Sequence, residues 1–116
     1  MSSLNLNYKT YNYSVVVLKS SNYKKLKDIT GKNLGYYDDG SDITKEALNK
    51  VMTKEELKYK DYNDTEKLAN ALMDKKVDSI LIENSYLDIL NENITIDGKS
   101  FKDYIRKIYG FVLVKK

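Results

Sequence analysis

Strand-like and helix-like segments alternate along this chain. Residues 14–18 form a continuous apolar, largely β-branched run, which favours a strand buried on both faces over an amphipathic one. Residues 109–114 have the same character near the other end of the chain. Between these two runs, apolar strand-like segments alternate with helical patterns. This alternation is typical of α/β proteins with a largely parallel sheet.

Three inner strands are expected, at residues 33–37, 57–62 and 77–82. The first leads directly into a helix that begins at Ser41 or Asp42, because either side chain can cap free backbone N–H groups. The apolar positions of this helix share one face: Ile43, Ala47, Leu48 and Val51.

Two further helices follow the second and third inner strands. Residues 63–66 resemble a capping box, after which Thr65, Leu68, Ala69 and Leu72 line one helical face. Asn84 or Ser85 is then expected to cap a short helix whose buried side consists of Tyr86, Ile89 and Leu90. Residues 91–98 are polar and turn-rich and predict a surface loop.

The composition excludes several kinds of chemistry. The chain has no Cys and no His, so thiol catalysis, disulfides, Ser-His-Asp triads and ordinary zinc sites are ruled out. Only oxygen-ligand metals remain possible, and the acidic residues do not match the twelve-residue calcium loop. Arg106 is the only arginine, which argues against a clamp of several guanidinium groups on phosphates. We therefore expect no enzyme, no cofactor and no metal.

The charge pattern bears on partners and location. The net charge is +3, and the basic residues are scattered, which favours a solvated lysine-rich surface over a nucleic-acid stripe. Lysine outnumbers arginine nineteen to one, a bias typical of AT-rich genes. No segment approaches the run of about 20 apolar residues that spans a bilayer, and the N-terminus lacks the features of a signal peptide. The protein is expected either to be soluble as it stands or to be a soluble piece of a membrane-anchored parent.

Polar side chains gather where two of the expected strands end. In open α/β sheets, ligands bind at the carboxyl ends of strands, where helix N-termini offer unpaired N–H donors. The candidate ligand-binding residues are Tyr37, Asp38, Asp39, Gly40, Ser41, Asp42, Glu83 and Asn84. A Gly followed by a Ser suits an anion, but the three Asp residues of the same turn would repel one. A simpler interpretation stays open, in which these residues cap helices and are otherwise solvated.

Two segments of the chain resemble one lobe of a type II extracytoplasmic solute-binding protein. Residues 20–36 resemble its "short helix, D-x-x-G-K, strand" entry, and residues 69–86 resemble a later strand of the same lobe. The terminal runs 14–19 and 109–115 resemble its two hinge strands. At 116 residues the chain has the length of one lobe. The resemblance implies a three-layer α/β/α fold with a mostly parallel five-stranded sheet, formed by residues 13–116, with residues 1–12 as a flexible leader or an expression remnant.

Residues 13–21, 82–90 and 107–111 resemble more closely the accessory extracellular domain of some LytR-CpsA-Psr proteins of low-GC Gram-positive bacteria. These proteins are membrane-anchored and associated with attaching anionic polymers to the cell wall, and their catalytic core has no counterpart here. This resemblance implies a non-catalytic ligand-sensing or protein-docking domain at the extracellular face of the membrane. Its partners would be the rest of its own membrane protein, a cell-wall component or a small polar ligand, and not a nucleic acid.

The alternative is one lobe of an ABC-transporter solute-binding protein for a small polar solute. Compared with amino-acid carriers, however, a Gly-Thr-type carboxylate grip is replaced by three acidic residues, and Glu83 stands where a shorter Asp is expected. These departures put a free amino acid in doubt as the ligand.

Overall fold

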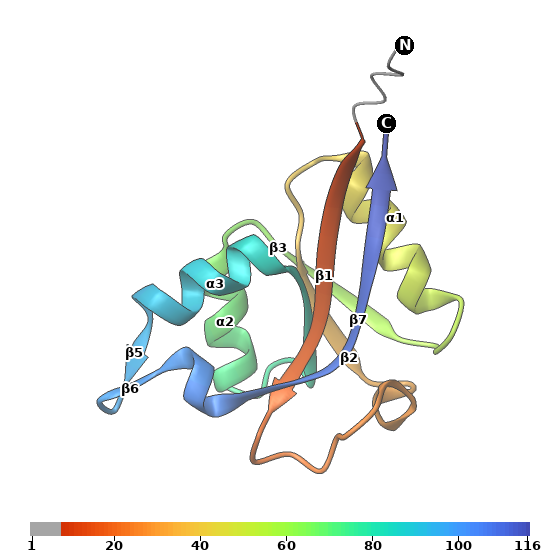
Figure 1. Ribbon diagram of the computed structural model, residues 1–116. Helices are drawn as coiled ribbons and strands as arrows, with labels where there is room; N and C mark the ends of the chain where they lie inside the picture. Colours follow the sequence, from red (N-terminus) through yellow and green to blue (C-terminus); the bar gives the residue numbers. More distant parts are fainter. Residues whose placement is uncertain (1–7) are drawn as a thin grey trace.

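A five-stranded β-sheet with helices on both faces forms the fold (Figure 1). The structure, a computed structural model, describes residues 8–116. The strands of the sheet are β1 (Lys9–Leu18), β2 (Asn33–Tyr37), β3 (Lys58–Tyr62), β4 (Ser79–Glu83) and β7 (Ile105–Lys115). The α-helices are α1 (Asp42–Met52), α2 (Thr65–Met73) and α3 (Asn84–Asn93). The remaining elements are the 3-10 helices η1 (Leu26–Ile29) and η2 (Phe101–Tyr104) and the short strands β5 (Thr95–Ile96) and β6 (Lys99–Ser100).

The strand order of the sheet is β3-β2-β4-β1-β7. Strand β2 pairs in parallel with both β3 and β4, whereas β1 pairs antiparallel with β4 on one side and with β7 on the other. All strands except β1 therefore run in the same direction. This arrangement confirms the predicted mostly parallel five-stranded sheet and places the two long terminal strands side by side at one edge.

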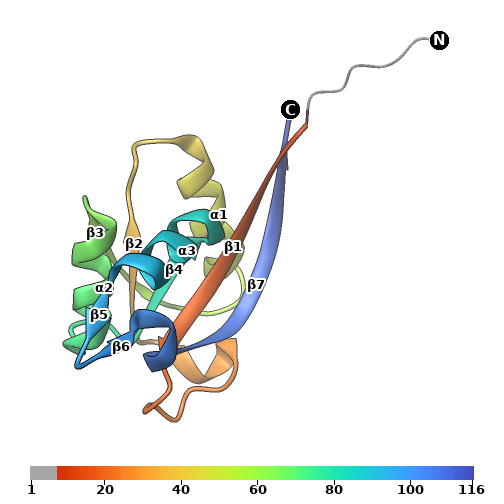
Figure 2. The same ribbon diagram turned by 60° about the vertical axis from the view of Figure 1, so that its left-hand side comes forward.

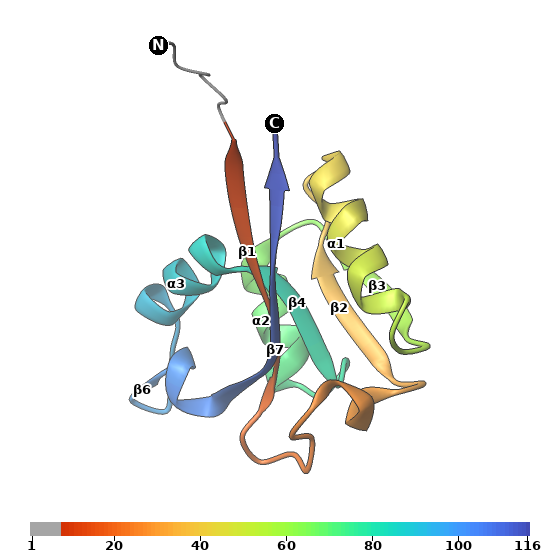
Figure 3. The ribbon, with the colours of Figure 1, turned by 45° about the vertical axis from the view of Figure 1, so that its right-hand side comes forward.

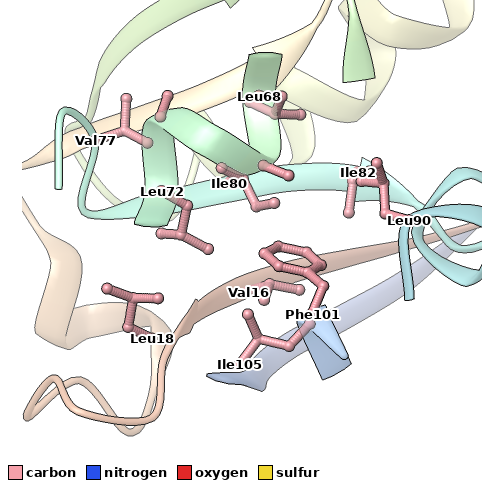
Figure 4. Packing of buried hydrophobic residues seen from close by; sticks show 12 residues of the cluster. Val16, Leu18, Leu68, Leu72, Val77, Ile80, Ile82, Leu90, Phe101 and Ile105 are labelled. Atoms are coloured by element: carbon pink, nitrogen blue, oxygen red, sulfur yellow. The ribbon is translucent and has the colours of Figure 1, made fainter. Parts of the chain in front are cut away.

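Residues 13–18 of β1 are buried on both faces, as the apolar run predicts. Val15 and Val17 pack with α1 and η1 on one side of the sheet, and Val16 packs with α2 and α3 on the other. Figure 3 shows the helices on these two sides. On the second side, the fully buried ring of Phe101 from η2 lies among Val16, Ile80 and other apolar side chains (Figure 4). The three-layer α/β/α architecture is confirmed.

Helix α2 approaches β2 closely at Gly35. A Cβ atom added at this glycine would lie 2.9 Å from Cδ1 of Leu68 and 3.2 Å from Cε1 of Tyr62. Distances this short leave no room for a side chain without movement of the neighbouring atoms. Glycine at this strand position therefore sets the spacing between helix and sheet.

Strands β1 and β7 extend past the end of the sheet as a two-stranded ribbon. Tyr13 pairs with Glu83, the last residue of β4, while Lys9 pairs with Lys115 further along the ribbon. Figures 1 and 2 show the two strands running beyond the other strands. Residues 9–12, which fall within the expected leader, are part of β1, and residues 1–7 lie outside the described residues.

Two local predictions are wrong. Of the three residues expected on the buried side of α3, only Leu90 is buried, and Tyr86 and Ile89 are 36% and 51% exposed. The reason is that α3 lies at the margin of the sheet, against α2, β1 and η2, and buries a narrower stripe than expected. Its N-cap is Glu83, one residue before the predicted caps.

The predicted surface loop at residues 91–98 is also wrong. Helix α3 continues to Asn93, and β5 and β6 then form a small hairpin. Its turn contains Asp97 and Gly98, with φ angles of 50° and 79°. An Asp-Gly pair with positive φ at both residues matches the tight turn that joins antiparallel strands. Within residues 8–116, none of the helices is long and apolar enough to cross a membrane.

Candidate ligand-binding site

A pocket opens at the carboxyl ends of β2 and β4, beside the base of the β1–β7 ribbon. Its cavity volume is about 20 Å³, and that of an adjoining hollow, which shares four of its residues, is about 170 Å³. We call the two together the tyrosine pocket. Its walls are formed by Tyr11, Tyr13, Tyr36, Tyr37, Asp39, Ser41, Ile43, Thr44, Leu81, Ile82, Glu83 and Tyr86.

Asp39 is fixed by the turn between β2 and α1. Its Oδ1 accepts hydrogen bonds from the backbone N–H of Ser41 and from the hydroxyl of Thr44, both at 2.9 Å. Burial opposes ionisation of Asp39, but the Ser41 side chain, the Ser41 backbone N–H and the Thr44 hydroxyl together outweigh burial and hold the pKa of its carboxyl below the usual value. No hydrogen bond to Oδ2 is found within residues 8–116. Asp39 is therefore an ionised carboxylate with one oxygen still able to accept.

Helix α1 begins at this turn as the sequence predicts. Ser41 is the N-cap, and its hydroxyl oxygen accepts the backbone N–H of Thr44 at 3.5 Å. Gly40 has a φ of 78°, a conformation that glycine adopts without strain, and its N–H donates to Oδ1 of Asp38 at 2.8 Å. The backbone N–H groups of Gly40 and Thr44 are thus paired with side chains of the same turn.

Glu83 occupies the matching position at the end of β4, where it caps α3. Its Oε2 accepts the backbone N–H of Ser85 at 2.8 Å, and its Oε1 accepts the Ser85 hydroxyl. Asn84 has a different role: its Oδ1 accepts a hydrogen bond of 2.6 Å from the hydroxyl of Ser14 on β1. Asn84 therefore joins the start of α3 to the sheet and does not line the tyrosine pocket.

Aromatic rings form most of the remaining wall. The ring of Tyr13 stacks on Phe111 with centroids 5.5 Å apart, and Tyr37 meets Tyr86 edge to face at 5.4 Å. Burial, together with the charges of Asp39 and Glu83, raises the pKa of Tyr13 to about 12, against a smaller opposing effect of Thr44. Burial also raises the pKa of Tyr86. Both phenols are consequently neutral at physiological pH.

The structure brings together four of the eight residues predicted for the site. Tyr37, Asp39, Ser41 and Glu83 line the tyrosine pocket, whereas Asp38, Gly40, Asp42 and Asn84 do not. That the lining residues bind a ligand stays a prediction.

Sequence reasoning missed Tyr13, Thr44 and Tyr86. Tyr13 lies beside Glu83 only because β1 pairs with β4, and no local sequence signal shows that pairing. Thr44 was detectable from the sequence, since it stands three residues after the cap Ser41. Within residues 8–116, no group of three or more acidic side chains is placed so as to hold a metal ion.

Comparison with known proteins gives a family and a fold. A family model described as NMT1/THI5 like matches residues 3–115. No curated protein sequence matches the chain.

Several solved structures have a similar fold. The second substrate-binding domain of a putative amino acid ABC transporter from Streptococcus pneumoniae has a TM-score of 0.67 and 18% identity, over 97% of this chain and 51% of its own. A periplasmic sulfonate-binding protein of a putative sulfonate ABC transporter from Methylobacillus flagellatus has a TM-score of 0.63 and 22% identity, over 86% of this chain and 28% of its own. An ancestral arginine-binding protein bound to arginine has a TM-score of 0.63 and 20% identity, over 89% and 42%.

At these identities the similarity shows the fold, which is a single lobe like that of periplasmic binding proteins. The chain spans about half, or less, of the length of these solved structures.

The predicted relation to LytR-CpsA-Psr proteins is wrong, because the family match and the similar structures lie elsewhere. Of the three segments that suggested it, residues 13–21 overlap β1, residues 82–90 contain the end of β4 and most of α3, and residues 107–111 lie in β7. The predicted function, a sensing or docking domain of a LytR-type membrane protein, is therefore wrong as well.

Proposed function

This chain belongs to the NMT1/THI5-like family, and we propose that it is one lobe of the solute-binding protein of an ABC transporter, with a small polar solute held in the tyrosine pocket. The observation that carries the proposal is the position of the pocket. It lies at the carboxyl ends of β2 and β4, the edge where open α/β sheets bind ligands.

The β1–β7 ribbon supports the same role. It passes the tyrosine pocket and continues beyond the sheet, with Lys9 paired to Lys115 at its far end. A second lobe joined through these two strands would face the pocket and cover a solute bound there. The similar solved structures are about twice as long as this chain or longer, which leaves room for such a lobe.

The chemistry of the pocket suits a polar solute of modest size. Carboxylate and hydroxyl groups of Asp39, Glu83 and Ser41 supply polar contacts, and tyrosine rings supply flat apolar walls. The role is non-enzymatic, so the transporter and the solute are the expected partners. The excess of lysine over arginine is typical of AT-rich genes and fits a low-GC Gram-positive source, where we place the protein at the outer face of the membrane.

Chemical-shift titration of the isotope-labelled chain tests the proposal. Because one lobe supplies only part of the contacts, we expect dissociation constants near 1 mM, which corresponds to about 4 kcal/mol. Panels of amino acids, sulfonates, amines and neutral polar solutes should include at least one class that shifts the backbone signals of residues 37–44 and 83–86 in a saturable way. The proposal fails if no class does so.

A further inference from the structure

We propose that the solute of the tyrosine pocket is an organic cation, carrying an ammonium or guanidinium group, and not a carboxylate or sulfonate. This inference rests on the proposed function, since it names the chemical class of the solute for the same pocket. It follows from three features of the wall: how the helix N-termini are used, which charges are present, and how the tyrosine rings are placed.

Both helix N-termini at the pocket are occupied by the protein's own side chains. At α1, Asp39 and Ser41 accept the N–H groups of Ser41 and Thr44. At α3, Glu83 accepts the N–H of Ser85. An α/β protein commonly holds an anionic group on N–H donors of this kind. Here the carboxylates of Asp39 and Glu83 already occupy the N-termini of α1 and α3, where an anionic solute would bind.

An anionic solute would also meet unbalanced negative charge. Asp39 and Glu83 line both parts of the pocket, and no Lys or Arg within residues 8–116 lines either part. A second negative charge at about 4 Å from one of these carboxylates is disfavoured by about 4 kcal/mol near a protein surface. A cation at the same distance gains from the same interaction.

Asp39 is prepared to accept a donor. Its Oδ1 takes both hydrogen bonds that hold the side chain, and these bonds keep the carboxylate ionised. Its Oδ2 has no hydrogen bond within residues 8–116. Thr44, which is 6% exposed, fixes the carboxylate from the buried side. An N–H of a cationic group can therefore bind Oδ2 while both hydrogen bonds to Oδ1 are kept.

The tyrosines complete a cation site. Tyr37 and Tyr86 meet at an interplanar angle of 76°, so that the two rings form a corner, and Tyr86 is 36% exposed. Tyr13 is 8% exposed. A cation over a tyrosine face gains about 0.5 to 2 kcal/mol, depending on how far it is desolvated. Carboxylates beside such rings favour a positively charged group over an uncharged one of the same shape.

A titration with matched probes tests the inference on the 116-residue chain. The probes are choline, its uncharged carbon analogue 3,3-dimethylbutan-1-ol, the diamine-like agmatine, and ethanesulfonate. We expect choline or agmatine to shift the backbone signals of Asp39, Thr44, Glu83 and Tyr86, and to bind at least about tenfold more tightly than the uncharged analogue, a difference of about 1.4 kcal/mol. Ethanesulfonate should leave these signals unchanged.

Variants separate charge recognition from loss of structure. Asp39→Asn should weaken the cation about tenfold and leave 3,3-dimethylbutan-1-ol unaffected, whereas Asp88→Asn, an exposed carboxylate of α3 outside the pocket, should change neither. Saturable binding of ethanesulfonate, or equal binding of choline and its uncharged analogue, would overturn the inference and leave the proposed function standing. Equal shifts from sodium chloride at matched ionic strength would overturn it as well. Absence of binding by every class of solute would remove the proposed function itself.

Discussion

The hydroxyl of Thr44 donates a hydrogen bond of 2.9 Å to Oδ1 of Asp39. The two residues are five positions apart and belong to different parts of the turn between β2 and α1, since Asp39 follows the strand and Thr44 lies in the first turn of the helix. Their bond ties the charged wall of the tyrosine pocket to a buried residue of the scaffold. The charge of Asp39 and the stability of the turn both depend on this hydrogen bond.

Thr44→Val removes this hydrogen bond while nearly preserving shape. We expect the pKa of Asp39 to rise toward its ordinary value, because one of the bonds that favours the ionised form is lost. Stability at neutral pH should fall by about 1 kcal/mol, the usual worth of one hydrogen bond. Carbon-detected pH titration of Asp39 and urea unfolding measure the two effects.

The stability lost in Thr44→Val should depend on pH in one direction. Because the folded-state pKa of Asp39 lies below the unfolded value of about 3.9, its stabilising effect is present above that pH and is lost as the pH falls through the folded-state pKa. Thr44→Val should therefore destabilise the protein more at neutral pH than at about pH 2. An equal loss at both pH values would mean that Thr44 acts through packing and not through the carboxylate.

Gly35→Ala should destabilise the fold by about 1 to 3 kcal/mol, the range for overpacking a tight core. The added methyl group would meet three buried or half-buried side chains, among them Leu68 at 2.9 Å. Gly110→Ala is the matched control, since its nearest atoms belong to the end of the exposed Lys107 side chain, which can move into solvent. Urea unfolding compares them, and equal stability of the two variants would contradict the account of the helix α2 contact.

Tyr13 should make the protein sensitive to alkali. Its pKa is about 12 in the folded protein and about 10 when unfolded, so the folded state holds the phenol proton more tightly. The corresponding stability is fully present below about pH 10 and is lost as the pH rises toward 12, by up to about 2 to 3 kcal/mol at most.

Tyr13→Phe tests this behaviour. The variant should lose less stability than the wild type between about pH 8 and about pH 11.5, because the group that must ionise is gone. Tyr8→Phe, at a tyrosine that is 53% exposed, should follow the wild-type pH dependence. Identical alkaline profiles for wild type and Tyr13→Phe in urea unfolding would contradict the assignment.

Helices and strands that are specified by neighbouring residues could be predicted from the sequence. Strand β2 and helix α1 occur where expected, because the apolar run at 33–37 and the cap at Ser41 act locally. The Asp97-Gly98 pair was an equally local hairpin signal that was overlooked, which is why the loop prediction failed.

Features that depend on distant pairing could not be predicted. Tyr13 joins the candidate site only because β1 inserts between β4 and β7, which places it opposite Glu83, seventy positions later in the chain. The exposed face of α3 likewise depends on where the helix docks at the sheet margin. Half of the candidate residues line the pocket because the carboxyl ends of parallel strands meet at one edge, a rule that applies without knowledge of the strand order.

Intermolecular nuclear Overhauser effects between a bound solute and the tyrosine rings test the central claim most directly. For any solute that binds the chain in a saturable way, the account predicts contacts from solute protons to the ring protons of Tyr37 and Tyr86. The contrary result would be contacts confined to another hollow, such as the one of about 180 Å³ lined by Tyr23 and Asp78 near the other end of β4. That result would contradict the assignment of the tyrosine pocket as the solute site.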